Sequence, residues 1–404
     1  MFTPFSGKRK GSSGPQIPPC PPKRSRQGRG TNSPEGLTGE CFFPTLSLKN
    51  QDGREPYFLA VLAKLQGPAG RDRGIQRPVR SCRSHHPLGN KPGILRPDVG
   101  GARGGKALPE RVIAFVNFKG GVGKTANVVN IGACLAKYHG KRVLIVDLDA
   151  QCNSSLWLMK PEELEGHNRD LRGCVYQIFR DRMVGSSVFD FGRAVVRGVP
   201  RKNYPLIANL DLLPSAVEMA MIEDQIHQIK SISAFTILYQ ALKPHWGSYD
   251  YVFLDCPPNL YTVSKNAIFA AQYCVVPYIP DYLSLSGFRV LAEMIDQFYH
   301  RLSGQMTVRP RPQIAAFVIN HFARQRKVFE TGVNEFEMMV NRLKAEGKIH
   351  PKAQCLYPYI RFNVHVAEST SEHLPVILHR EESIGSQDYA DLTQNFIHHF
   401  EVTL

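Results

Sequence analysis

The sequence predicts an α/β fold over residues 107–404, with a mostly parallel sheet covered by helices on both faces. From Arg111 onward, short strands that are apolar on both faces alternate with helical segments, which is typical of a parallel sheet buried between two helical layers. A glycine-rich run at residues 120–125 separates the first strand from the first helix. The composition also changes near residue 106, where a stretch rich in proline and glycine ends.

The first 106 residues are predicted to be a disordered, basic tail. They contain 17 Gly and 14 Pro, a proportion typical of disordered sequence. They carry 19 of the chain's 50 Lys and Arg but only 6 of its 35 Asp and Glu, so most of the formal net charge of +15 belongs to the tail. Only Pro56–Leu65 could form a short apolar element, and Lys8–Lys10 and Lys23–Arg26 are candidate DNA-contact or import signals.

The expected strands and helices of residues 107–404 follow from local composition and periodicity. Five short segments rich in β-branched and aromatic residues are predicted strands: Val112–Phe118, Arg142–Leu148, Tyr251–Leu254, Tyr273–Tyr278 and Ile314–Asn320. Four segments are predicted helices: Lys124–Tyr138, Thr262–Ala271, Leu285–Arg301 and Phe329–Glu346. Gly140 is expected to end the first helix. No regular element is predicted over residues 160–235.

Cysteine usage and hydropathy favour a soluble, cytoplasmic protein. The nine cysteines include no Cys-x-x-Cys pair and no Cys/His cluster at metal-ligand spacing, which argues against a disulfide framework or a zinc site. No run approaches the roughly 18 apolar residues that a membrane helix needs, and the chain does not begin with the pattern of a secretion signal. We therefore expect reduced thiols and no membrane insertion.

Gly120–Thr125 lies between a predicted strand and a predicted helix, which is the context of a phosphate-binding P-loop. Glycines let successive backbone N–H groups turn toward phosphate oxygens, and the helix N-terminus adds partial positive charge. In such a loop Lys124 reaches the β and γ phosphates, while the Thr125 hydroxyl ligates Mg²⁺. The sequence therefore predicts a P-loop NTPase fold that binds a nucleoside triphosphate with Mg²⁺.

Three aspartates at the ends of predicted strands are the candidate acidic groups. Asp255 ends the strand that begins at Tyr251, and we expect it to hold the metal together with Thr125. Asp147 and Asp149 lie where another strand ends and project to the same side. One of them could bond the P-loop region and the other could orient the water that attacks the γ phosphate; these residues alone do not say which.

Four segments together resemble one known family. Lys119–Thr125 looks like the deviant Walker A motif of the ParA/MinD/Soj ATPases, whose hallmark is the extra lysine, here Lys119. Asp147–Gln151 is similar to the family's Asp-x-Asp-Pro-Gln switch segment, and Asp250–Pro258 is similar to its Walker B run. Further segments that follow the family pattern in order are Val276–Tyr282 with Gly287, and short motifs between Asn363 and Tyr389. The resemblance covers roughly residues 111–400.

The resemblance implies roles for individual residues. Lys119 would cross to the nucleotide of a partner copy in an ATP-bound homodimer, and Asp149 would position the attacking water. The implied catalytic residues are Lys119, Lys124 and Asp149, and the implied metal ligands are Thr125, Asp147 and Asp255. The residues expected to contact the nucleotide are Lys119, Gly120, Gly121, Val122, Gly123, Lys124, Thr125, Ala126 and Asn320.

The resemblance also implies a cellular function. It is an ATP-dependent dimerisation switch in plasmid or chromosome partition, which binds DNA without sequence preference and works with a ParB-like centromere-binding partner. The protein would then be cytoplasmic and associated with the nucleoid. Candidate DNA contacts are Arg324, Arg326, Lys327 and Arg361.

The chain departs from the family pattern at several positions. Ala126 replaces a hydroxyl residue, Ala150 replaces the switch proline and Cys152 replaces a glycine, and each change is expected to alter the hydrolysis rate or the switch geometry. Arg361 and Phe362 stand where the family has Pro-Arg, so the DNA contacts are the part of the resemblance that these residues support least.

Three alternatives stay open from the sequence. The first is an ATPase like MinD on a membrane surface, although Asp391–Leu404 offers little positive charge for lipid. The second is an electron-transfer ATPase like nitrogenase iron protein, with Cys174 and Cys256 as poorly placed cluster ligands. The third is a ParA-like ATPase that positions another cargo, because the ATPase motifs do not encode the cargo.

Overall fold

The computed structural model describes residues 111–404 except residues 227–231, 281, 304–311 and 322–326. The predicted tail, with its apolar element and basic clusters, lies outside the described residues. So do Arg324, Arg326 and the side chain of Lys327, three of the four expected DNA contacts.

Within this part of the chain, seven parallel strands form one sheet in the order β3-β2-β4-β1-β5-β6-β7. The strands are β1 (Arg111–Phe115), β2 (Val143–Asp147), β3 (Leu210–Leu213), β4 (Tyr251–Asp255), β5 (Tyr273–Tyr278), β6 (Gln313–Ile319) and β7 (Gln354–Leu356). The inner strands are buried on both faces, as their unbroken apolar sequences require. Because every pairing is parallel, the carboxyl ends of all the strands meet at one edge of the sheet.

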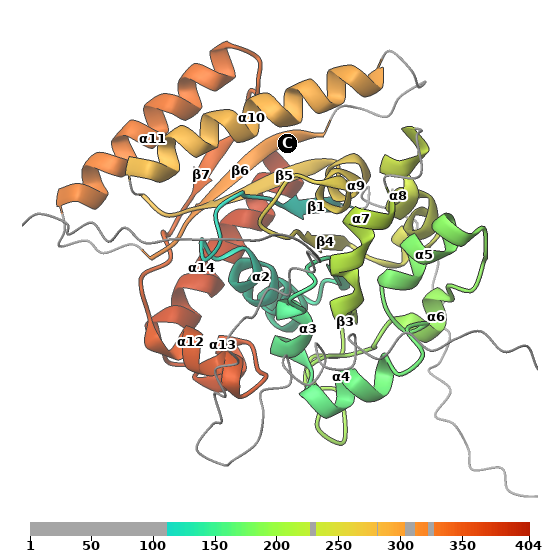
Figure 1. Ribbon diagram of the computed structural model, residues 1–404. Helices are drawn as coiled ribbons and strands as arrows, with labels where there is room; N and C mark the ends of the chain where they lie inside the picture. The colour runs from blue at the N-terminus through green and yellow to red at the C-terminus, as the bar shows by residue number, and fades with distance from the viewer. Residues whose placement is uncertain (1–110, 227–231, 281, 304–311, 322–326) are drawn as a thin grey trace, which may run out of the picture. The chain divides into compact units, whose positions relative to one another are not determined.

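Two layers of helices cover the sheet. Alternate residues of β1 face opposite layers, so that Val112 and Ala114 join one hydrophobic core while Ile113 and Phe115 join the other. Figure 1 shows α10 and α11 on one side of the sheet and α2 with α14 on the other. The layer with α10 (Tyr282–Ser303) and α11 (Lys327–Ala345) also holds α5 (Tyr176–Val184), α6 (Phe191–Ala194), α7 (Ile222–Ile226), α8 (Ile237–Leu242) and α9 (Thr262–Ala270).

The opposite layer carries the helix that follows the glycine-rich run. It contains α2 (Lys124–His139), α3 (Asn153–Leu158), α4 (Pro161–His167), α12 (Val364–Ser371), α13 (Val376–His379) and α14 (Ile384–His398). Short 3₁₀ segments are η1 (Val217–Met221), η2 (Ile232–Phe235) and η3 (Lys243–Ser248), and a π-helical turn, η4 (His399–Thr403), follows α14. Among the described residues, none of these helices combines the length and hydropathy that a membrane crossing needs.

The structure confirms the predicted fold class, and all five predicted strands and four predicted helices are present. Gly140 ends α2 with a left-handed φ of 62°, and its N–H bonds to the Leu135 carbonyl. The first strand ends at Phe115, three residues earlier than predicted, because the chain turns there into the glycine-rich loop. Two edge-side strands were missed: β3 has only four residues and β7 only three, too few for a period-2 pattern.

Candidate functional site

A cleft of about 1210 Å³ lies at the carboxyl edge of the sheet. It is bordered by the loop between β1 and α2, by the segments that follow β2, β4 and β6, and by the segment before α12. Ligands of parallel α/β sheets bind at this edge, where the connections diverge to the two helical layers. The cleft brings together the phosphate loop (residues 116–123) and most of the predicted site residues.

The phosphate loop depends on glycine at two positions. Gly121 and Gly123 have left-handed φ values of 73° and 90°, which residues with a Cβ rarely adopt. A Cβ at Gly123 would also lie 2.8 Å from Nδ2 of Asn320. That amide group donates a 2.8 Å hydrogen bond to the Val122 carbonyl, so it supports the loop from the end of β6.

The loop opens α2 with its first backbone N–H groups uncapped by a side chain. Gly123 is the N-cap residue and makes no side-chain cap, and the first turn contains no acidic residue. The N–H groups and the helix dipole therefore favour an anion in the cleft. At Gly120 and Gly121, no atom lies within 4 Å of the position that a Cβ would take, which leaves this side of the loop open.

The two lysines of the motif have different environments. Lys124 is 8% exposed, and its Nζ donates a 3.2 Å hydrogen bond to the carbonyl of Lys119. Burial lowers the pKa of Lys124, while Asp255 and Asp149 act in the opposite direction. Lys119 is exposed, and its backbone N–H donates to Oδ1 of Asn117 at 3.0 Å. Asn117 also donates to the Pro277 carbonyl, which ties the start of the loop to β5.

Asp147 and Asp255 end the neighbouring strands β2 and β4 and are register partners. Both carboxylates are almost completely buried. Burial raises the pKa of each; repulsion by Asp255 adds to the rise at Asp147, and hydroxyl groups of Ser154 and Thr125 oppose it at Asp255. Two buried carboxyl groups on paired residues of neighbouring strands favour a cation or a proton between the strand ends.

The two carboxylates of the Asp-Leu-Asp segment have different surroundings. Asp147 does not line the cleft: its Oδ2 accepts hydrogen bonds from the N–H and hydroxyl of Ser155 at 2.8 and 2.7 Å, and its Oδ1 accepts from the N–H of Asp149. Asp149 lines the cleft, and burial raises its pKa. Thr125 and Asp149 line the cleft, whereas Asp147 and Asp255 lie buried behind it at the strand ends. The metal roles expected of Asp147 and Asp255 stay predictions.

The remaining predicted nucleotide contacts divide in the same way. Gly120, Gly121, Gly123, Lys124, Thr125, Ala126 and Asn320 line the cleft. Lys119 and Val122 do not; the side chain of Val122 is fully buried, and its carbonyl accepts from Asn320.

Two departures from the family pattern have a visible structural setting. Cys152 has a left-handed φ of 55° where α3 begins, so the residue type usual at this place, glycine, suits the backbone better. Arg361 pairs with the buried carboxylate of Asp388 through Nε and Nη2, at distances of 2.6 to 3.1 Å, and lines the cleft. Phe362, next to it, is 73% exposed.

Three supporting residues were missed by the sequence reasoning. Ser154 and Ser155 each bond one of the buried aspartates, Asp255 and Asp147, and Asn117 fixes the start of the phosphate loop. Their signal in the sequence is weak, since it consists only of small polar residues close to the acidic and glycine-rich motifs. Hydrogen bonds between residues of different elements cannot be derived from the spacing of those residues along the sequence.

Comparison with known proteins identifies the family of the chain. A family model described as an AAA domain matches residues 110–308. The sporulation initiation inhibitor protein Soj of Bacillus subtilis is 30% identical over 284 residues, which are 70% of this chain and 97% of Soj. This chain belongs to the ParA/Soj/MinD family of P-loop ATPases.

Two other members of the family agree with this assignment. The chromosome partitioning protein ParA of Caulobacter vibrioides is 29% identical over 292 residues, 72% of this chain and 95% of that protein. The solved structure of the septum site-determining protein MinD of Pyrococcus horikoshii, complexed with Mg-ADP, has a TM-score of 0.52 at 20% identity and covers 73% of this chain and 99% of its own. At that identity the likeness to MinD shows the fold of this ParA-type ATPase.

The iron–sulfur alternative is not favoured by the geometry. Cys174 and Cys256 are at most 1% exposed. Burial raises the pKa of the Cys174 thiol to about 12 and that of Cys256 well above its ordinary value. A cluster at a dimer interface needs accessible thiolates, which these two residues do not supply.

Proposed function

We propose that this ParA-type protein is an ATP-dependent dimerisation switch that binds and hydrolyses ATP with Mg²⁺ and acts in plasmid or chromosome partition. Residues 107–404 would form the ATPase domain and residues 1–106 a basic tail. The partners would be a second copy of the chain, nonspecific DNA and a ParB-like centromere-binding protein. The protein would be cytoplasmic and associated with the nucleoid.

The observation that carries the proposal is the contrast between two lysines of one loop. Lys124 is buried beside Asp255 and Asp149, in place to meet the phosphates of a nucleotide in its own cleft. Lys119, five residues earlier in the same loop, is exposed, and in the proposed dimer its ammonium group would contact the nucleotide of the second copy. A ligand shifts a monomer–dimer equilibrium only by binding one state better, and a lysine shared across the interface supplies that difference.

The residues around the cleft fit a nucleotide with Mg²⁺. Oδ1 of Asp255 is buried and, among the described residues, accepts no hydrogen bond, as expected of an oxygen reserved for a cation or its water. The Thr125 hydroxyl lies beside the same carboxylate. Thr125 and Asp255 would hold the ion, which when bound neutralises phosphate charge and orients the γ phosphate.

Asp149 is the proposed positioning group for the attacking water. Its backbone N–H is held by Asp147, and its Oδ1 accepts from the N–H of Gln151 at 3.0 Å. The carboxylate is thereby fixed at the wall of the cleft near Lys124. A fixed carboxylate orients water without a conformational search, which is how positioning lowers the barrier.

The alternative of a MinD-like ATPase on a membrane surface is less well supported. The C-terminal segment would have to be free to lie on lipid. Instead Phe396 and Phe400 are buried against the sheet, and Glu401 bonds Lys141 at 2.8 Å and the Tyr251 hydroxyl at 2.7 Å. Phe396, Phe400 and Glu401 thus hold the C-terminal segment against the core of the domain.

Nucleotide and DNA binding by purified protein test the proposal. We expect Lys124→Ala to abolish ATP binding or turnover, because no other lysine is buried beside Asp255 and Asp149 among the described residues. Lys202→Ala removes an exposed lysine that does not line the cleft, so it is the matched control. DNA binding should be stronger with ATP than without it, and it should weaken steeply as the salt concentration rises.

Unchanged turnover in Lys124→Ala would refute the ATPase assignment. DNA affinity that does not change with salt would refute the proposed phosphate contacts. Capture of the wild-type protein by anionic liposomes, lost on removing the last 14 residues, would instead favour the membrane alternative.

A further inference from the structure

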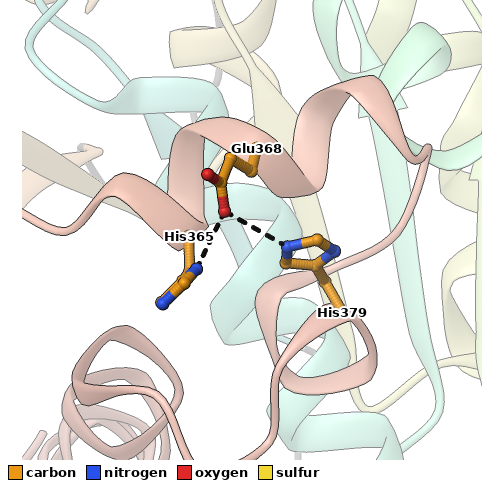
Figure 2. Close-up of side chains that lie close together, drawn as sticks. All are labelled: His365, Glu368 and His379. Atoms are coloured by element: carbon orange, nitrogen blue, oxygen red, sulfur yellow. Dashed lines mark hydrogen bonds and ion pairs between the residues drawn. The ribbon is translucent and has the colours of Figure 1, made fainter.

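Three metal-binding side chains meet on the surface formed by α12 and α13. His365 and Glu368 lie three residues apart on α12, and His379 is the last residue of α13. Figure 2 shows the three side chains turned toward one another, with Glu368 between the two imidazoles. One nitrogen of each histidine and one carboxylate oxygen all lie within 4.8 Å of each other.

The spacing is close to that of a metal centre. A tetrahedral ion with bonds of about 2.1 Å separates its ligand atoms by roughly 3.4 Å. Here Oε2 of Glu368 is 2.8 Å from Nδ1 of His365 and 3.7 Å from Nε2 of His379. The glutamate is half exposed, so its side chain can rotate, and small adjustments of it and of the two imidazoles would place all three atoms around one ion.

The two helices that carry these residues are anchored. Oδ1 of Asn363 caps α12 by accepting from the N–H of His365 at 2.8 Å. The N–H of Val376 at the start of α13 donates to Oδ1 of Asn130 in α2, also at 2.8 Å, and the side chain of Val376 is fully buried. The ligands are thus held before any ion arrives, which reduces the conformational entropy that binding must overcome.

The donor set selects a class of ion. Two imidazole nitrogens with one carboxylate oxygen suit Zn²⁺ and its transition-metal neighbours, whereas Mg²⁺ and Ca²⁺ prefer oxygen ligands alone. The histidine side chains are 29% and 20% exposed and the glutamate 51%, so an ion can enter from solvent and keep water as a fourth ligand.

The interpretation that needs no ligand is a surface ion pair between His365 and Glu368, one turn apart on a helix. It accounts for two of the three residues. It does not account for His379, which comes from a different helix and points its Nε2 at the same carboxylate oxygen. Convergence of three donors from two anchored elements is the observation that favours a ligand.

We propose that His365, Glu368 and His379 bind one Zn²⁺-class divalent ion, which ties α12 to α13. The site is separate from the phosphate loop and does not depend on the proposed ATPase cycle. It also amends the expectation from the sequence that there is no zinc site, which considered cysteine-containing spacings.

Metal titration of the full chain tests the proposal. After removal of metal with a chelator, wild type, His365→Gln, His379→Gln and the double variant are titrated with Zn²⁺ by calorimetry and with Co²⁺ by visible absorption. We expect wild type to bind one more equivalent than the double variant, with Co²⁺ bands of a nitrogen and oxygen site and no thiolate charge transfer. Each single change should weaken this equivalent at least about tenfold, the lower end of the effect of losing an outer-shell partner.

Controls keep the result interpretable. His398→Gln removes an exposed histidine outside the cluster and should leave the titration unchanged. Cysteines and the remaining histidines are common to all variants, so they cancel in the comparison. Zn²⁺ should also raise the thermal unfolding midpoint of wild type more than that of the double variant, because an ion that binds only the folded chain stabilises it.

Equal stoichiometry and affinity in wild type and the double variant would overturn the proposal. So would a Co²⁺ spectrum dominated by thiolate charge transfer that is the same in both. Circular dichroism of the metal-free variants establishes that they are folded, as expected for substitutions of partly exposed side chains.

Discussion

Replacing Gly123 by alanine should destabilise the phosphate loop more than the same change at Gly120 or Gly121. Alanine would have to adopt a φ near 90°, and a left-handed residue costs about 1–2 kcal/mol. Its Cβ would also meet Nδ2 of Asn320 at 2.8 Å and displace the hydrogen bond to Val122, which costs about 1–3 kcal/mol more for a buried polar group. The expected loss of unfolding free energy is therefore about 2–5 kcal/mol.

The neighbouring glycines separate the two contributions. Gly121→Ala has a positive φ but no atom within 4 Å, so it should cost only the strain, about 1–2 kcal/mol. Gly120→Ala has neither and should lie within about 0.5 kcal/mol of wild type or be slightly more stable, because alanine restricts the unfolded chain. Urea unfolding of the nucleotide-free proteins measures all three.

A double-mutant cycle isolates the clash. Asn320→Ala removes the atom that a Cβ at Gly123 would meet, so in that background Gly123→Ala should cost only the strain, and the two changes should fail to add by about 1–3 kcal/mol. If Gly123→Ala costs no more than Gly121→Ala, or if the two changes simply add, then Asn320 does not constrain the loop as described.

Three further predictions concern buried charge and core packing. Asp388→Asn should lower the unfolding free energy by about 1–2 kcal/mol, since it weakens a charge-assisted pair whose arginine is half exposed; a change below about 0.3 kcal/mol in urea unfolding would contradict this. Burial raises the pKa of Asp255, so between about pH 4 and that raised pKa the folded chain holds a proton that the unfolded chain has lost. The free energy of unfolding of the metal-free protein should therefore fall as the pH rises through this range. The difference in unfolding free energy between wild type and Asp255→Asn should show this slope, and a difference that does not change with pH would count against it. Phe400→Ala should cost about 3–5 kcal/mol in the same assay, because the ring is 3% exposed in the core between α14 and the sheet; a small effect would mean that the C-terminal segment is loosely held.

The fold could be predicted from the sequence wherever elements were long and apolar. Central strands such as Val143–Asp147 are buried on both faces, so their composition alone separates them from loops. The strand Leu210–Leu213 could not be found, because Asp211 interrupts it and its partner is an arginine 14 residues away. Only tertiary structure makes that aspartate acceptable in a strand: it accepts hydrogen bonds from Arg197 and from the Tyr249 hydroxyl.

The site could be predicted in its motifs but not in its supports. Glycine and lysine of the phosphate loop have a mechanism that depends on local sequence, and the structure places Lys124 in the lining of the cleft, with its Nζ bonded to the carbonyl of Lys119. The different surroundings of Asp147 and Asp149 could not be predicted from spacing, since both follow the same strand. They depend on Ser155, which lies on the next helix and donates to the Asp147 carboxylate.

The central claim is that Lys119 couples nucleotide to dimerisation, and sedimentation velocity tests it most directly. Asp149→Ala, expected to keep ATP intact, should sediment as a dimer with ATP and Mg²⁺ and as a monomer with ADP. Adding Lys119→Ala should leave ATP binding measurable but yield a monomer, while adding Lys202→Ala should leave the dimer in place. An ATP-dependent dimer that forms equally well without the Lys119 side chain would contradict the account.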